Sequence, residues 1–410
     1  MSKLAEDLSP EAARRQLVER LMANGRITRP DVAEAFMAVP RDRFAPAGTS
    51  VRDAYSDGVV VTKRDVDGRA CSSISAAWLQ AYMLETAQLR PGSRVLEIGG
   101  GGYNAALIAE LVGPVGAVTS IDIDSDVVTS ARVALDRTGY PQVQVVQADG
   151  EHGFPSNAPY DAIIVTVEAA DLPPAWTRQL AQGGLLVTPL RFRANTRCLT
   201  FENRGDHLTA VAALQCGFVS MKGEGNTPMR RFRLRGDDIV LSVDDTTTQV
   251  DGEALAAALE SPRAEFWPPV TAEMDERGAF ESIHLWLACQ PRPYGVLTVD
   301  RDRAGDLLDP DNKFTCPTLL SPTSFAHLTL RQPERGVYQF GAHGFGPDAG
   351  DLAAELVDLI VGWDRNHRHG PGPVITAHPA DTTLPSGDGL RLLVPRRHRL
   401  VAITWPGGTQ

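Results

Sequence analysis

The sequence predicts an α/β fold built on a doubly wound, Rossmann-like sheet, with an additional α+β domain towards the C-terminus. Three observations predict it. Apolar runs alternate with helical stretches between about residues 90 and 190, and three of these runs end in an acidic residue. The first such run is followed by four glycines. The chain of 410 residues is also long for a single domain, which indicates two.

The N-terminal part is expected to be helical. Residues 10–24 have an amphipathic pattern, and a second helix is expected from Pro30, a residue favoured at the first helical position, to Val39. A loop then leads to the serine-rich segment Cys71–Ser75. Another helix is expected from Ala76 to Leu89, before a proline and a glycine.

The organising feature is a strand followed by a glycine turn and a helix. An apolar strand with Glu97 near its end is followed by Gly99–Gly102, and a helix is expected from Asn104. Glycines suit such a turn because the backbone bends sharply and a ligand can approach without meeting a Cβ atom. This is the first βα unit of a nucleotide-binding sheet.

Acidic residues mark the ends of two further strands. Asp122 follows an apolar run about twenty residues after the glycines, a spacing that suits a carboxylate binding ribose hydroxyls. Asp149 and Gly150 follow residues 143–148, and two more strands are expected at residues 158–166 and 180–187. A cluster of acids would repel phosphate. It suits a ligand with ribose, adenine and a cationic centre, so S-adenosylmethionine fits better than NAD.

Composition excludes several classes of protein. A net charge of −11 argues against nucleic-acid binding. No apolar run is long enough for a membrane span, and the N-terminal residues have no apolar signal core, so no membrane partner is expected. The odd number of cysteines, without paired spacing, indicates a reducing cytoplasm and neither a disulfide framework nor a metal site; they are Cys71, Cys198, Cys216, Cys289 and Cys316.

The order of motifs resembles the protein L-isoaspartate O-methyltransferase family over roughly residues 10–220. The similarity rests on a helix, Val39-Pro40-Arg41-x-x-Phe44, Tyr55-x-Asp57, Ser73-Ile74-Ser75, a second helix, Val95-Leu96-Glu97-Ile98-Gly99, and the fourth and fifth strands. The resemblance implies a class I methyltransferase sheet that binds S-adenosylmethionine and an enzyme that esterifies a peptide carboxylate.

The resemblance also assigns the cofactor residues by position. Asp122 would hold the ribose with Ile123 beside the adenine, and Asp149 and Gly150 would face the adenine edge. The residues that would flank the methionine end of the cofactor are Glu97, Gly99, Gly101, Tyr103 and Asn104.

The family serine falls on Ser75, with Ser73 in the place of the family threonine and Ser72 beside it. Because a carboxylate is already ionised at neutral pH, transfer needs hydroxyl donors that orient it and no strong base. Which serine does so stays open. The alternative is that these hydroxyls only cap the following helix.

Three departures from the family pattern affect the functional interpretation. The glycine turn is one residue shorter, so its third glycine is shifted or lost, and Ala77 stands where the family usually has proline. Nearly half of the chain also lies beyond the resemblance. Such an extension is typical of members that act in ribosomal peptide biosynthesis, such as those that modify lanthipeptides.

The sequence-based hypothesis is therefore methylation of an aspartate in a ribosomally made, modified peptide, leading through a succinimide to isoaspartate. The alternatives are a repair methyltransferase acting on isoaspartyl proteins, and a peptide-binding protein that has lost catalysis, which only the shortened turn supports. The acids at three strand ends argue against that last alternative.

The expected domains are a catalytic domain, residues 1–225, and an accessory α+β domain, residues 235–410, that binds the peptide. In the second, helices are expected at 252–259 and 350–363, and strands at 231–235, 239–243, 283–289, 390–394 and 399–403. The segments 367–369 and 395–399 are expected to be an exposed loop and an exposed turn.

Overall fold

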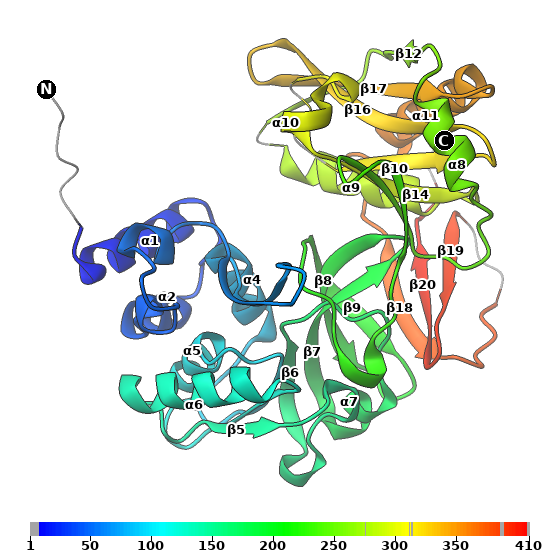
Figure 1. Cartoon of the computed structure of the whole chain (residues 1–410). Helices are drawn as coiled ribbons and strands as arrows, with labels where there is room; N and C mark the ends of the chain where they lie inside the picture. Colours follow the sequence, from blue (N-terminus) through cyan, green and yellow to red (C-terminus); the bar gives the residue numbers. More distant parts are fainter. Residues whose placement is uncertain (1–7, 275, 311, 313–314, 386–388, 408–410) are drawn as a thin grey trace, which may run out of the picture.

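The computed structural model describes residues 8–407, except 275, 311, 313–314 and 386–388. Figure 1 shows helices and a large sheet in the lower part of the molecule, a second sheet with its helices above them, and the N-terminal helices at one side. In the described residues no helix is both long and apolar enough to cross a membrane.

Helices of the N-terminal half cover one face of the large sheet. Both predicted N-terminal helices form with a proline at the first position, and Ser9 caps the first. Their apolar sides share one core with the sheet. The helices are α1 (Pro10–Ala23), α2 (Pro30–Ala38), α3 (Val51–Ala54), α4 (Ala77–Ala87), α5 (Tyr103–Val112) and α6 (Ser125–Thr138), and α7 (Pro174–Gln179) lies on the other face.

The large sheet contains the predicted parallel strands in doubly wound order. The order along it is β5-β4-β3-β6-β7, with β8 and β9 continuing it in antiparallel fashion. These strands are β3 (Arg94–Ile98), β4 (Ala117–Asp122), β5 (Gln144–Gln147), β6 (Tyr160–Val165), β7 (Leu180–Phe192), β8 (Asn195–Asn203) and β9 (Leu208–Gln215). The carboxyl ends of β3, β4 and β5 therefore lie at one edge, as the sequence predicts.

A separate hairpin lies between α3 and α4 in the chain. Its strands, β1 (Val60–Arg64) and β2 (Ala70–Ile74), pair only with each other in the described part of the chain. The hairpin contains Cys71, Ser72 and Ser73, and Ser75 follows directly after it.

The second sheet is antiparallel and consists of residues 230–345. Its order is β10-β11-β14-β15-β16-β17-β12, with β13 also on β17. The strands are β10 (Arg230–Arg235), β11 (Ile239–Val243), β12 (Ala264–Phe266), β13 (Thr271–Glu273), β14 (Tyr294–Val299), β15 (Cys316–Leu320), β16 (Phe325–Glu334) and β17 (Val337–Phe345). Helices α8 (Gly252–Ala258), α9 (Arg277–Ala288), α10 (Arg301–Ala304) and α11 (Ala349–Asn366) accompany it.

The strand expected at residues 283–289 is wrong, because this segment belongs to helix α9. Leu285 and Cys289 pack into the core of the large sheet, while Ile283 and Leu287 pack into the core of the second sheet. Residues 283–289 form the second half of α9 and its C-cap, which are buried between two layers. This stretch therefore contains almost only apolar residues and resembles a buried strand when read alone.

The last three strands return to the large sheet, which differs from the division expected at residue 235. Thr376 and Ala377 of β18 (Val374–Pro379) pair with β9, and β20 (Arg399–Thr404) and β19 (Arg391–Pro395) follow. Figure 1 shows these strands beside β9, below the second sheet. The second domain therefore lies within the chain of the first.

Candidate functional site

The glycine turn after β3 is shaped by contacts that exclude side chains. A Cβ atom on Gly100 would lie 1.9 Å from the hydroxyl oxygen of Ser120, and one on Gly99 would lie 2.7 Å from Val167. Gly101 faces open space. Gly102 has a φ of +92° directly before α5, so the shortened turn keeps a glycine where the left-handed conformation requires one.

Glu97 supports this turn from within the sheet. Its carboxylate is fully buried and accepts hydrogen bonds from the Ser120 hydroxyl at 2.6 Å and the Asn104 amide at 3.0 Å. Burial raises the pKa of Glu97 above its ordinary value. The side-chain amide oxygen of Asn104, Oδ1, is buried and has no hydrogen-bond partner in the described residues. Glu97 and Asn104 thus hold the glycine corner.

A pocket of about 50 Å³ lies at the carboxyl ends of β3 and β4. Four of the predicted cofactor residues line it: Gly99, Asp122, Ile123 and Gly150. Asp122 accepts a hydrogen bond from the Asp124 backbone at 2.8 Å, and burial raises its pKa to about 6. A carboxylate and the apolar side chain of Ile123 therefore line the pocket together at the tip of β4.

Asp149 lies beside this pocket but is bonded to neighbouring loops. One carboxylate oxygen accepts the Glu151 N–H at 2.9 Å and the other accepts the Glu224 N–H at 3.0 Å. Asp149 is absent from the residues that line the pocket, which include the following Gly150. Its visible role is to fix the loop at residues 223–225.

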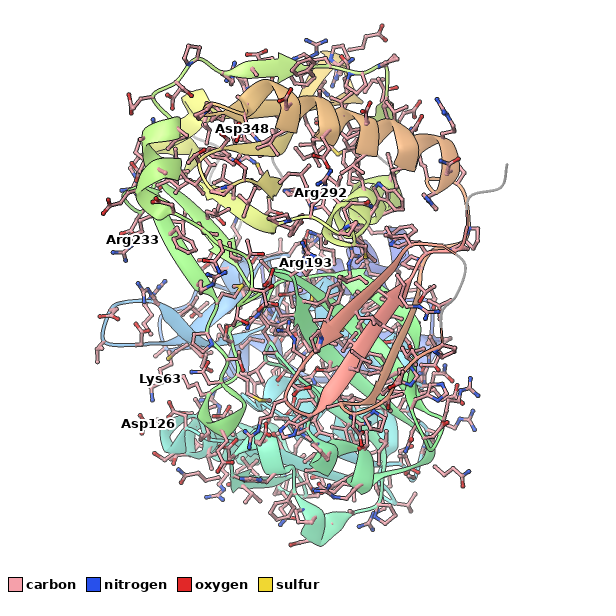
Figure 2. The ribbon with its side chains drawn as sticks, turned by 90° about the vertical axis from the view of Figure 1, so that its right-hand side faces the viewer. Lys63, Asp126, Arg193, Arg233, Arg292 and Asp348 are labelled. Atoms are coloured by element: carbon pink, nitrogen blue, oxygen red, sulfur yellow. The ribbon has the colours of Figure 1, made fainter. Side chains whose placement is uncertain are left out.

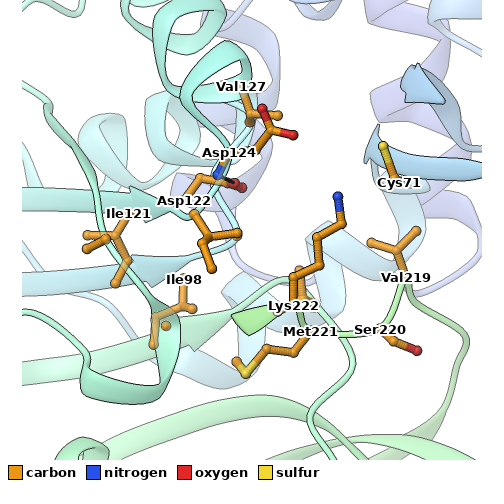
Figure 3. Close-up of a pocket in the computed structure, with 15 residues that line it drawn as sticks. Cys71, Ile98, Ile121, Asp122, Asp124, Val127, Val219, Ser220, Met221 and Lys222 are labelled. Carbon is orange, nitrogen blue, oxygen red and sulfur yellow. Dashed lines mark hydrogen bonds between the residues drawn. The ribbon is translucent and has the colours of Figure 1, made fainter. Parts of the chain in front are cut away.

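Sequence analysis missed the segment Val219–Lys222, which closes one side of the pocket. The backbone of Glu168 holds it, by donating to Val219 at 2.8 Å and accepting from Met221 at 2.9 Å. Figure 3 shows the Lys222 side chain extending into the space between Asp122 and Cys71. No local motif marks this segment, since its position depends on pairing with a residue some fifty positions earlier.

A second cavity of about 550 Å³ adjoins the first and shares Val127 with it. Gly101 and Ser72 both line this cavity, so it joins the glycine turn to the hairpin. The Lys63 ammonium on β1 donates to Asp124 at 2.7 Å and to Asp126 at 2.8 Å. This contact fastens the hairpin to the start of α6, and Figure 2 shows Lys63 and Asp126 close together on one side of the molecule.

The three serines lie in different surroundings. The Ser72 hydroxyl accepts a hydrogen bond from Thr62 at 2.9 Å and lines the second cavity. Ser73 and Ser75 are half-buried and are not among the residues that line these two cavities. Helix capping is wrong as an explanation of the serines, because α4 begins after Ala76 and has no side-chain cap.

A buried arginine positions the segment of Ser75. The Arg41 guanidinium donates to the carbonyl oxygens of Ser75 and Ala54, each at 2.8 Å, and to the Gln80 side chain at 2.7 Å. It also lies 5.1 Å from the ring centre of Tyr103. Arg41 therefore joins the serine segment to the residue that follows the glycine turn.

Tyr103 itself belongs to the core. It is buried and packs edge-on against Phe44 at 5.6 Å, and burial raises its pKa to about 12. In the described part of the chain, no group of three or more His, Cys, Asp or Glu residues is placed to hold a metal ion.

Comparison with known proteins places this geometry among methyltransferases. Residues 12–225 match the family model described as protein-L-isoaspartate(D-aspartate) O-methyltransferase. The chain is 44% identical over 181 residues to a protein-L-isoaspartate O-methyltransferase of Ignicoccus hospitalis, covering 44% of this chain and 82% of the relative. It is 39% identical over 215 residues to one of Methanopyrus kandleri, covering 52% of this chain and 92% of that one.

A solved structure extends the likeness beyond the matched region. A protein named protein-L-isoaspartate O-methyltransferase has a TM-score of 0.50 and 23% identity, with 88% of this chain and 96% of that chain covered. At this identity the likeness concerns the fold alone. Because so much of the chain is covered, the similar fold includes much of the part after residue 225.

Proposed function

Because the chain belongs to the protein-L-isoaspartate(D-aspartate) O-methyltransferase family, we propose that it methylates the free carboxylate of an isoaspartyl residue in a polypeptide. Family membership makes it an S-adenosylmethionine-dependent carboxyl O-methyltransferase. The family match and the named relatives favour an isoaspartyl acceptor over the aspartyl residue of a modified ribosomal peptide that the sequence led us to expect.

The observation that carries the proposal is that one pocket is lined both by the glycine turn after β3 and by the acidic residue Asp122 at the end of β4. Asp122 would accept hydrogen bonds from ribose hydroxyls, and Ile123 would pack against adenine. Gly99 lines this pocket and Gly101 lines the adjoining cavity, and neither has a side chain that would extend towards a ligand. When bound, S-adenosylmethionine supplies an electrophilic methyl group on a sulfonium.

The residues of the chain have a positioning role in this reaction. The acceptor carboxylate is ionised at neutral pH, so no protein base has to remove a proton. Hydroxyl groups of the serine segment would hold its oxygens, and Arg41 fixes the backbone of Ser75. The hairpin would exclude water from the acceptor, which otherwise keeps its hydration shell.

A pair of peptides tests the proposal. The full-length enzyme is incubated with S-adenosylmethionine and either of two peptides that differ only in an isoaspartyl or an aspartyl linkage. We expect a base-labile methyl ester on the isoaspartyl peptide alone, identified by mass spectrometry. Binding of the cofactor without an ester on either peptide would contradict the proposal.

A second candidate is methylation of an aspartyl residue in a ribosomally made, lanthipeptide-like substrate. The observation in its favour is the large second domain, which the family model does not include. The likeness of a named isoaspartate methyltransferase over 88% of the chain weakens this argument. An ester on the aspartyl peptide, followed by loss of methanol to a succinimide and its hydrolysis to isoaspartate, would favour this candidate.

We further propose a reducing, cytoplasmic location. All five cysteines are free, although Cys198 and Cys216 lie in the same region. The peptide-binding protein without catalysis is the least supported alternative, because the shortened turn keeps its glycine before α5. Calorimetry that detects no binding of S-adenosylhomocysteine would support that alternative.

A further inference from the structure

Strand β10 leaves one edge of the second sheet open. It is the first strand in the sheet order and pairs only with β11 in the described part of the chain. Its six residues correspond to about 20 Å of extended backbone. The unpaired N–H and C=O groups of such an edge are a template for another extended chain.

The side chains of β10 divide into an inner and an outer set. Phe232 and Leu234 pack into the core beside α8, and a Cβ atom on Gly252 would lie 2.9 Å from the Phe232 ring. The outer residues Arg231, Arg233 and Arg235 are exposed. One face of the edge strand is therefore packed against the core, and its other face is exposed and basic.

This edge faces the turn of the β1–β2 hairpin across a cleft of about 1180 Å³. The charged residues that line the cleft come from the hairpin turn, from β10 and the turn after it, and from the start of α8, and they are of both signs: Asp67, Arg69, Arg231, Arg233, Asp237, Asp251 and Glu253. Figure 2 shows Arg233 pointing outward on the same side of the molecule as Lys63. The hairpin therefore lines both this cleft and the cavity that contains Ser72.

The ion pairs inside the cleft are weak and local. Arg233 pairs with Asp237 at 2.9 Å and Arg69 pairs with Asp67 at 3.8 Å, all four side chains being exposed. Exposed pairs of this kind contribute little and exchange readily with a competing carboxylate. The Arg231 guanidinium forms no ion pair or hydrogen bond with the other described residues, so one cation of the cleft is available.

We propose that the polypeptide substrate binds to β10 by strand addition. The bound segment is extended, and acidic side chains at every second position contact Arg231 and Arg233. This inference rests on the proposed carboxyl methylation, since it concerns how the same substrate is held. Backbone pairing supplies affinity for many sequences, and alternate arginines select acidic ones. The segment then runs along the hairpin, which ends at the serines.

Backbone pairing is tested with a fluorescent peptide that alternates acidic and apolar residues around one isoaspartyl residue. Two analogues are N-methylated on every second amide, one in each register. Because alternate N–H groups of an added strand face the enzyme, we expect one analogue to lose binding and the other to keep it. Fluorescence anisotropy with the full-length enzyme measures this, and equal binding of both analogues would overturn strand addition.

The role of the arginines is tested by charge reversal. The double variant Arg231→Glu, Arg233→Glu should bind the acidic peptide about tenfold more weakly, because two exposed ion pairs become repulsions. Arg335→Glu makes the same kind of change at an exposed turn between β16 and β17 and serves as the control. Equal loss in both proteins, or no loss in either, would contradict the role of the arginines.

These measurements separate the docking inference from the proposed function. Anisotropy needs no methyl transfer, so register-dependent binding without ester formation would support strand addition and contradict the isoaspartyl acceptor. If both N-methylated analogues are esterified equally, the isoaspartyl acceptor is supported and strand addition is contradicted.

Discussion

At the scale of single residues, the site depends on a carboxylate held in unfavourable surroundings. The pKa of Asp122 is raised to about 6, chiefly because burial disfavours the charged form of its carboxyl group. Its charge is unfavourable for the folded protein alone but suits a ligand with hydroxyl donors. Asp122 was predictable because it follows a strand at a fixed distance from the glycines. Lys222, which faces it, was not, since a distant backbone contact positions it.

Protonation of Asp122 should weaken cofactor binding. We expect the affinity for S-adenosylhomocysteine, measured by calorimetry, to fall as the pH is lowered from 7.5 through 6 to 5. The ionised form accepts ribose hydrogen bonds and the protonated form accepts them poorly. Asp122→Asn should bind about ten- to a hundredfold more weakly at pH 7.5 and lack this pH dependence.

The same variant should be more stable than the wild type at high pH. A carboxyl group whose pKa is raised on folding stabilises the folded state below its unfolded pKa, and this stability is lost as the pH rises through 6. Asn keeps an oxygen for the Asp124 N–H without the buried charge. Urea unfolding at pH 8 should therefore give a higher midpoint for Asp122→Asn, and a lower one would contradict the assigned cause.

The serines can be ranked by single replacements with alanine. From its family position, Ser75 is the residue that would hold the acceptor carboxylate, so we expect Ser75→Ala to lower kcat for methyl transfer by about tenfold or more. Ser72→Ala and Ser73→Ala should lower it less, and none of the three should alter cofactor affinity. A loss confined to Ser72→Ala would instead assign the orienting hydroxyl to the residue that lines the cavity.

At the scale of elements, the hairpin is a separate two-stranded sheet whose base is anchored in the core by Val60 and Ile74 and whose outer part is held by Lys63. A two-stranded sheet is marginally stable alone, so the contact of Lys63 with Asp124 and Asp126 matters for its position. The sequence predicted most elements that have one buried and one polar side, because apolar and polar residues then alternate regularly along the chain. It failed at α9, which is buried on two sides, and at His367, which is buried with its ring centre 4.3 Å from that of Trp286, whereas His369 is exposed as expected.

Replacing Lys63 with methionine should release the hairpin. We expect faster amide hydrogen exchange at residues 60–74 and a higher KM for the peptide, while exchange in β16 and β17 stays unchanged. Hydrogen exchange followed by mass spectrometry gives both in one experiment. Unchanged exchange in the hairpin would show that other contacts hold it.

At the scale of the whole molecule, a buried charge network joins the two domains to the pocket. Arg191 on β7 donates to Glu168 at 2.9 Å and to Asp244, beyond β11, at 3.0 Å, and Asp244 also accepts from Arg396. Glu168 holds the segment that closes the pocket at the ends of β3 and β4. The segment 395–399 forms a turn, but it is less exposed than the sequence suggested, because Arg396 bonds to Asp244 in this network and the half-buried His398 bonds to Glu151.

The network predicts that Arg191→Met destabilises the entire protein. Removing the guanidinium leaves the buried Glu168 with hydroxyl donors but no cation, and leaves Asp244 with Arg396 alone. Loss of the shared cation from two buried carboxylates costs about 3–5 kcal/mol. Arg204→Met, which removes an exposed pair with Glu202, should cost less than about 1 kcal/mol. Denaturant unfolding measures both, and similar costs for the two variants would contradict the network.

The strands at the C-terminus were recognisable from the sequence, but their place in the structure was not. Alternation of buried and exposed residues identifies a strand without naming its neighbour, so residues 390–394 and 399–403 were assigned to the nearer domain. They join the large sheet through β18, which pairs with both β20 and β9. The pairing of β18 with β9 brings together segments on either side of the intervening domain.

The return of β18 to β9 has a consequence for biosynthesis. On the ribosome, β9 emerges long before its partner strand, and the complete second sheet is translated in between. A premature stop codon within residues 230–370 would leave β9 as an unprotected edge, open to pairing with other nascent chains and to aggregation.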